Sequence, residues 1–164
     1  MKNYIYIFLI AMVPLIELRG ALPVAYGIHT ANPDFSLLWS YIIIASGNML
    51  PVPFIYFFAR KVLEGGKDVK VRWFSRFCNW CLEKGEKGGE KLQAKAGRGL
   101  YWALLLFVGI PLPGTGAWTG TLAASFLDMD FKKSVLAVIG GVVLASIIVG
   151  VVCTLGFGAI FGIK

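Results

Sequence analysis

Two long stretches without a charged side chain limit what this chain can fold into. Residues 35–59 contain no charge, and neither do the thirty residues of 134–163. About 20 apolar residues cross the hydrocarbon core of a bilayer as a helix. One such stretch also occurs as the buried helix of a soluble protein, but two of them in 164 residues indicate an integral membrane protein. The composition agrees, because 57% of the residues are hydrophobic, against roughly 45–50% apolar usage in soluble domains.

The basic residues are concentrated in one part of the chain and predict its orientation. Eleven of the sixteen lysines and arginines lie between Arg60 and Arg98, together with five acidic residues. The positive-inside rule makes this segment cytoplasmic, along with Lys132 and Lys133, and places both termini outside. Nucleic-acid binding is the alternative explanation of the net charge of +7. Because the excess lies beside the spans, we expect contact with anionic membrane lipid and no nucleic-acid partner. The expected location is the plasma or inner membrane, with several passes.

The basic segment predicts an interfacial helix followed by a linker. Phe74, Phe77, Cys78 and Cys81 recur at helical spacing and form an apolar stripe, as in helices that lie in the headgroup plane. A Lys/Glu-rich stretch interrupted by glycines follows. Two cysteines in a CxxC spacing need two more ligands for zinc, and the only histidine, His29, is expected on the opposite side. We therefore expect no metal and no cofactor.

Two shorter apolar arms predict hairpins that enter the membrane without crossing it. Residues 4–16 and 100–112 are uncharged and thirteen residues long, so as helices they rise about 20 Å, short of a core about 30 Å thick. Each arm is followed by proline and glycine, and then by a second apolar arm, at 21–28 and 117–127. A short helix, a broken tip and a short returning helix describe a re-entrant hairpin.

The two halves of the chain share this order and predict an inverted repeat. Each hairpin precedes one long span, so the second half is upside down relative to the first, as in secondary transporters. The predicted fold class is an all-α integral membrane protein, an inverted repeat in which each half is a re-entrant helical hairpin plus one long transmembrane helix, joined by a cytoplasmic amphipathic helix. The chain forms a single membrane domain, with repeat one at 1–62, the interfacial helix and linker at 63–98, and repeat two at 99–164.

Two ionisable residues at the first tip are the main candidates for chemistry. A charge at bilayer depth costs at least about 2.5 kcal/mol on insertion scales and usually marks a pathway or a partner. Glu17 and Arg19 would not face each other on an intact helix, so either the backbone is unwound there or each has its own partner. Desolvation favours the neutral carboxyl group and a nearby guanidinium favours the carboxylate. We expect Glu17 to carry a coupling proton and Arg19 to bind an anionic group; a structural ion pair that fixes the tip is the alternative.

Other polar and small residues leave two interpretations open. The amide of Asn48, in the middle of the first span, needs a partner and either lines a path or joins two helices. At the second tip, Thr115 lies between Gly114 and Gly116, where backbone amides favour an anion or where a tight turn simply needs small residues. Small residues four apart in the last span serve internal packing or a homodimer. The sequence contains no catalytic constellation and no nucleotide-binding loop, so we do not expect an enzyme.

Three motifs carry a resemblance to a known family. They are Glu17-Leu-Arg-Gly-Ala-Leu-Pro23, Gly47-Asn-Met-Leu-Pro51 and Pro111-Leu-Pro-Gly-Thr-Gly-Ala-Trp118. Over essentially its whole length the chain resembles the small multidrug export protein family. That family looks like a distant branch of the DedA superfamily, whose members carry two opposed re-entrant hairpins and an aromatic-xxx-Arg motif. Tyr56-Phe-Phe-Ala-Arg60 is similar to that motif.

The resemblance implies a membrane transporter. The family name implies drug efflux, whereas the DedA relation implies proton-linked movement of a lipid phosphate such as an undecaprenyl carrier. We expect an ion- or proton-coupled transporter or flippase of an amphipathic substrate, with a proton-coupled small multidrug exporter as one alternative and a structural or assembly membrane protein as another. The site is expected between the two tips, with Arg19 or Gly20 close to Thr115 or Gly116. The predicted coupling and binding residues are Glu17, Arg19, Gly20, Asn48, Arg60, Pro113, Gly114, Thr115 and Gly116.

Overall fold

Every secondary-structure element in the described part of the chain is a helix. The computed structural model describes residues 2–59, 99–127 and 129–161, with Arg76, Asn79 and Glu83 as single residues. Most of the predicted interfacial helix and linker, and Arg60, therefore lie outside the described residues. The elements are α1 (Lys2–Met12), α2 (Glu17–Ala31), α3 (Leu37–Met49), α4 (Val52–Phe54), the π-helix η1 (Ile55–Ala59), α7 (Leu100–Gly109), α8 (Ala117–Phe126) and α9 (Phe131–Phe161).

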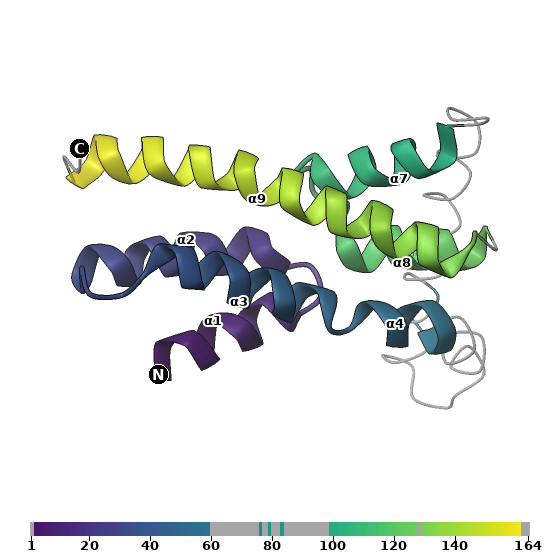
Figure 1. The fold of residues 1–164 in the computed structure, drawn as a ribbon, viewed down its shortest axis with the longest axis horizontal. Helices are drawn as coiled ribbons and strands as arrows, with labels where there is room; N and C mark the ends of the chain where they lie inside the picture. Colours follow the sequence, from purple (N-terminus) through teal and green to yellow (C-terminus); the bar gives the residue numbers. More distant parts are fainter. Residues whose placement is uncertain are drawn as a thin grey trace.

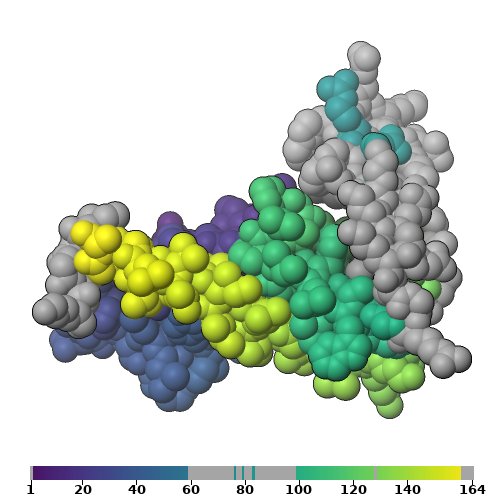
Figure 2. Space-filling model, turned by 90° about the horizontal axis from the view of Figure 1, so that it is seen from above, coloured from purple at the N-terminus to yellow at the C-terminus, as the bar shows by residue number. Residues whose placement is uncertain are grey.

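The helices form two helix-turn-helix pairs alongside two long rods. The pair α1–α2 opens toward one end of the long axis and the pair α7–α8 toward the other, so that their turns meet near the middle (Figure 1). The first rod is α3 followed by α4 and η1, and the second is α9, which runs in the opposite direction (Figure 1). In the space-filling view α9 lies along the surface with α7 beside it (Figure 2).

Both rods suit a membrane. The segments Leu37–Phe58 and Phe131–Ala159 are long and apolar enough to cross one. Much of the outward face of α9 is apolar and exposed, including Leu136, Val143 and Leu155. A contiguous apolar surface of this kind is unusual on a soluble monomer and is suited to lipid.

Glycines set the close packing of each rod on the first helix of the pair beside it. A Cβ on Gly47 of α3 would lie 2.7 Å from the Phe8 carbonyl oxygen of α1. A Cβ on Gly141 of α9 would lie 2.7 Å from the Leu105 carbonyl oxygen of α7. Backbone blocks the added carbon in both places, so only glycine permits this approach. Internal packing is thus one observed use of the small residues in the last span.

Two boundaries differ from the sequence prediction. The first turn spans Val13–Ile16, before Glu17, whereas we expected the break at 17–20, between the arms 4–16 and 21–28. The chain reverses earlier because Leu15 and Glu17 adopt left-handed φ values of 72° and 50°, and α2 then accommodates Pro23 within it. We expected one uninterrupted helix in 35–59, but the first rod has a turn at Leu50–Pro51. Pro51 and Pro53 both lack the backbone N–H that an uninterrupted helix needs.

Candidate functional site

The two turns meet through polar contacts between charged side chains of α2 and the segment that joins α7 to α8. We call this set of contacts, made by Glu17 and Arg19 with residues 110–118, the tip contact. The predicted approach of the two tips is confirmed at one pair of residues, because Arg19 Nη2 donates a hydrogen bond to Thr115 Oγ1 at 2.8 Å. These two residues are 96 positions apart in the sequence.

Glu17 caps a helix that belongs to the other pair. Its side chain is only 3% exposed. The backbone N–H of Trp118 donates to Glu17 Oε1 at 3.0 Å, and that of Ala117 donates to Oε2 at 3.3 Å. The first N–H groups of a helix have no partner within it and carry partial positive charge. The carboxylate therefore binds at the start of α8, where a negative charge is stabilised.

Gly116 leaves the space that the carboxylate occupies. Its φ of +140° is strongly disfavoured for residues with a side chain. A Cβ added there would lie 2.2 Å from Glu17 Oε2. This glycine is thus required twice, for its backbone conformation and for the close approach of Glu17.

Arg19 binds the other side of the same break. Its Nη1 donates to the Leu112 carbonyl oxygen at 2.6 Å, and Nη2 lies 3.4 Å from that of Ile110. Both carbonyls lie in the segment just beyond the C-terminal end of α7, so the guanidinium stands near the negative end of that helix. The Thr115 hydroxyl also contacts both carbonyls, at 2.8 and 2.9 Å, and so braces the turn.

The two charges therefore use different partners rather than each other. Among the described residues no salt bridge joins Glu17 and Arg19; the carboxylate binds the N-terminal end of α8 and the guanidinium binds the C-terminal side of α7. The sequence left open whether Glu17 and Arg19 pair with each other or each bind a separate partner, and the structure shows separate partners. Both charges are held by neutral groups of the second pair, so separating the turns would release both together.

The backbone at the first tip is strained. Leu15 and Glu17 have positive φ, which residues other than glycine rarely adopt. Each such residue costs on the order of 1–3 kcal/mol and persists only where its surroundings hold it. The contacts of Glu17 with α8 are part of what holds this turn.

None of the remaining described residues predicted for the site, Gly20, Asn48, Pro113 and Gly114, makes a side-chain bond in the tip contact. A Cβ built on Gly20 would meet only the Ile16 side chain, and nothing lies within 4 Å of a Cβ built on Gly114. Pro113 is exposed in the turn. Asn48 is completely buried, and neither of its side-chain polar atoms has a partner among the described residues. Nothing assigns Asn48 to the tip contact.

A second polar cluster was not expected from the sequence. The Tyr26 hydroxyl of α2 lies 3.1 Å from that of Tyr41 on α3 and 3.0 Å from that of Thr154 on α9. A Cβ on Gly150 would lie 2.0 Å from the Tyr41 oxygen, so this glycine admits the cluster. The only available signal was the presence of hydroxyl residues in otherwise apolar helices, which does not reveal that three helices bring them together.

No metal centre is formed by the described residues. They contain no group of three or more histidine, cysteine, aspartate or glutamate side chains that could bind a metal ion. His29 instead makes a local hydrogen bond from its Nδ1 to the Phe35 carbonyl group, at 2.7 Å. Cys78 and Cys81 lie outside the described residues.

The helices suited to crossing a bilayer, together with their exposed apolar faces, define a helical membrane protein. A family model described as "Putative small multi-drug export protein" matches residues 17–148. The chain belongs to this family, and the matched region begins at Glu17 and contains every residue of the tip contact. No curated protein and no solved structure matches the chain.

Proposed function

We propose that this chain is a proton-coupled membrane transporter of amphipathic compounds and that it works at the tip contact. The observation that supports this most directly is the buried Glu17 carboxylate, which is hydrogen-bonded by two backbone amides and makes no direct ion pair among the described residues. A proton can compete with such partners. The description of the family, which names export, supports transport as the class of activity.

The proposed membrane arrangement is an inverted repeat of two re-entrant hairpins. Helices α1 and α7 contain 11 and 10 residues, so they rise about 16 and 15 Å, half of a core about 30 Å thick. Entering from opposite faces, they would bring the tip contact to the bilayer midplane, where transporter sites form between broken helices. The matching glycine contacts of the two rods, at Gly47 and Gly141, support the repeat.

Protonation of Glu17 is the proposed switch. A neutral carboxyl group is a weaker acceptor than a carboxylate, and it no longer complements the positive start of α8. Oε2 is the less tightly held oxygen, since its amide partner lies at 3.3 Å, and it is the natural atom to receive the proton. Once neutral, the side chain releases the Ala117 and Trp118 amides, and a substrate oxyanion takes its place. One proton then enters with one negative charge.

The unpartnered donors at the contact favour a substrate rich in acceptor oxygens. Arg19 Nε and Trp118 Nε1 are buried without an acceptor among the described residues. A phosphate or carboxylate group on an amphipathic molecule would supply acceptors, and the arginine fork matches such groups. We therefore favour an anionic lipid-phosphate substrate, consistent with the proposed relation to the DedA superfamily.

A cationic drug is the second candidate substrate. The family description names drug export, and the Glu17 carboxylate could bind a cation directly in exchange for its proton. The two candidates differ in the sign of the substrate charge, which makes them separable in one assay.

The test is transport by the purified protein in proteoliposomes. A fluorescent short-chain phosphatidic acid and the cationic dye ethidium are offered separately, with and without a pH gradient. We expect the anionic probe to move faster with the gradient and the effect to disappear with a protonophore. Gradient-driven movement of ethidium alone would establish the drug-export alternative. Movement of neither probe by folded protein would favour a structural or assembly role.

Arg19→Lys should weaken substrate binding while leaving the gradient dependence unchanged. A lysine cannot offer a substrate oxyanion the two parallel donors of a guanidinium, although it would also lose the contacts with Leu112 and Thr115. Loss of one charge-assisted hydrogen bond costs about 1.5–3 kcal/mol, so the half-saturating concentration should rise at least about tenfold. The measurement is initial rate against probe concentration at two gradients. A normal half-saturating concentration would show that Arg19 only docks the two turns.

Cysteine labelling should find the two ends of the molecule on opposite sides of the membrane. Asp34 is exposed in the α2–α3 turn, and Lys132 is exposed in the first turn of α9. In a variant whose three native cysteines are serine, an impermeant maleimide should label Asp34→Cys in intact cells. It should label Lys132→Cys only after permeabilisation. The reverse pattern would overturn the predicted orientation.

A further inference from the structure

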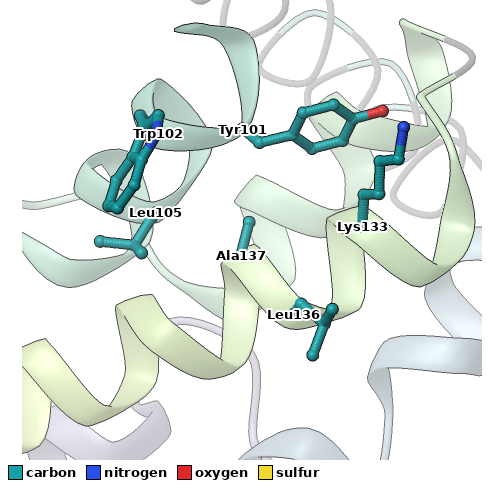
Figure 3. A pocket seen from close by; sticks show the side chains of 6 residues that line it. All are labelled: Tyr101, Trp102, Leu105, Lys133, Leu136 and Ala137. Atoms are coloured by element: carbon teal, nitrogen blue, oxygen red, sulfur yellow. The ribbon is translucent and has the colours of Figure 1, made fainter.

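A groove between α7 and α9 combines an apolar wall with one cationic end. It has a volume of about 350 Å³ and is lined by Tyr101, Trp102, Leu105, Lys133, Leu136 and Ala137. The Tyr101 hydroxyl and the Lys133 ammonium point to the same end, while Trp102 and Leu105 line the other (Figure 3). Trp102 is 72% exposed and Leu136 is 68% exposed, so the described residues leave the groove uncovered.

The polar groups at that end have few partners of their own. Lys133 Nζ lies 5.7 Å from the centroid of the Tyr101 ring, a cation–π contact that positions the ammonium at the groove. Within the described part of the chain, neither this ammonium nor the Tyr101 hydroxyl makes a hydrogen bond. The nearby Asp130 carboxylate accepts from the Lys133 backbone N–H at 3.0 Å and caps the start of α9. Among the described residues, therefore, no anionic group occupies the Lys133 ammonium at the groove.

We propose that this groove binds an anionic phospholipid, with its phosphate at Lys133 and Tyr101 and an acyl chain along Trp102, Leu105 and Leu136. The charge is complementary to an acidic headgroup, and the apolar wall continues along α9 in the direction that the chain would extend. Tryptophan and tyrosine beside a lysine are typical of the membrane interface. The site is separate from the tip contact, and the inference requires only that the chain lies in a membrane, not that it transports.

The experiment follows the fluorescence of Trp102 in vesicles. In a variant whose other four tryptophans are phenylalanine, brominated phosphatidylglycerol is compared with brominated phosphatidylcholine as a quencher. We expect the anionic lipid to quench Trp102 at a lower mole fraction. A lysine near an anionic surface contributes about 1 kcal/mol, so Lys133→Gln should reduce this preference about fivefold. Lys132→Gln removes the same charge from an exposed neighbour that does not line the groove, and should retain the preference.

The outcomes separate a site from general surface charge. Equal quenching by both lipids in the parent variant would overturn the proposal, as would equal losses in the two lysine variants. Insensitivity of Trp102 to either lipid would show that protein covers the groove and would also overturn it. If the single-tryptophan variant does not fold, native mass spectrometry of the otherwise unmodified protein replaces it. Phosphatidylglycerol adducts should then decrease with Lys133→Gln and persist with Lys132→Gln; unchanged adducts in both would refute the site.

Discussion

Gly116→Ala should strongly reduce transport and lower the stability of the folded protein. The added methyl group would lie 2.2 Å from Glu17 Oε2, so the carboxylate has to leave the start of α8. The φ of +140° adds backbone strain on the order of 1–3 kcal/mol. Losing a charge-assisted hydrogen bond adds about 1.5–3 kcal/mol. Together these predict destabilisation of about 3 kcal/mol or more and a fall in Tm of roughly 6–12 °C, measured by thermal unfolding in detergent, with transport reduced at least tenfold.

Gly114→Ala is the matched control for backbone strain. Gly114 also has positive φ, at +80°, but nothing lies within 4 Å of a Cβ built there. Its substitution should cost stability without displacing Glu17, and transport should survive. A second comparison repeats Gly116→Ala in a Glu17→Ala background, where the clash is gone and only the strain remains. If Gly116→Ala costs the same in both backgrounds, the glycine does not serve the carboxylate.

Much of the helical arrangement could be predicted from charge and proline positions. The uncharged stretch at 134–163 predicted most of α9, and the proline- and glycine-rich segment after residue 110 predicted the break between α7 and α8. The matching lengths of the two first arms predicted that the turns would meet. Each of these features is local, or depends only on the thickness of a bilayer, so a single sequence reveals it.

The partners of Glu17 and Arg19 could not be predicted, because they depend on long-range geometry. The sequence indicated that both residues were costly in an apolar setting, but not that each would bind a different end of the broken helix 90 or more positions away. The predicted position of the first break was also wrong. Leu15 and Glu17 adopt left-handed φ there, although neither has the conformational freedom of glycine. Propensity disfavours that conformation, and only the surrounding contacts stabilise it. The hydroxyl cluster at Tyr26 could not be predicted either, because it depends on contacts among three helices that are distant in the sequence.

Glu17→Gln should make transport independent of the pH gradient. The two amides of α8 both need an acceptor, whereas a glutamine offers one oxygen and one NH₂ group, so the start of α8 loses a partner. The substitution imitates a carboxyl group that is always protonated. The ratio of the rate with a gradient to the rate without one, measured in proteoliposomes, should fall to about one.

Glu17→Asp separates the charge from the reach of the side chain. Aspartate still titrates, but it is one methylene shorter and cannot bridge to Ala117 and Trp118 in the same geometry. We expect a slower protein whose rate still responds to the gradient, together with a lower Tm. If Glu17→Gln instead retains the full gradient response and loses only stability, Glu17 is a cap that docks one pair of helices on the other. Glu17 is the only carboxylate that the structure buries among the described residues. In that case, therefore, the coupling proton must be carried by a group other than a buried carboxylate of these residues.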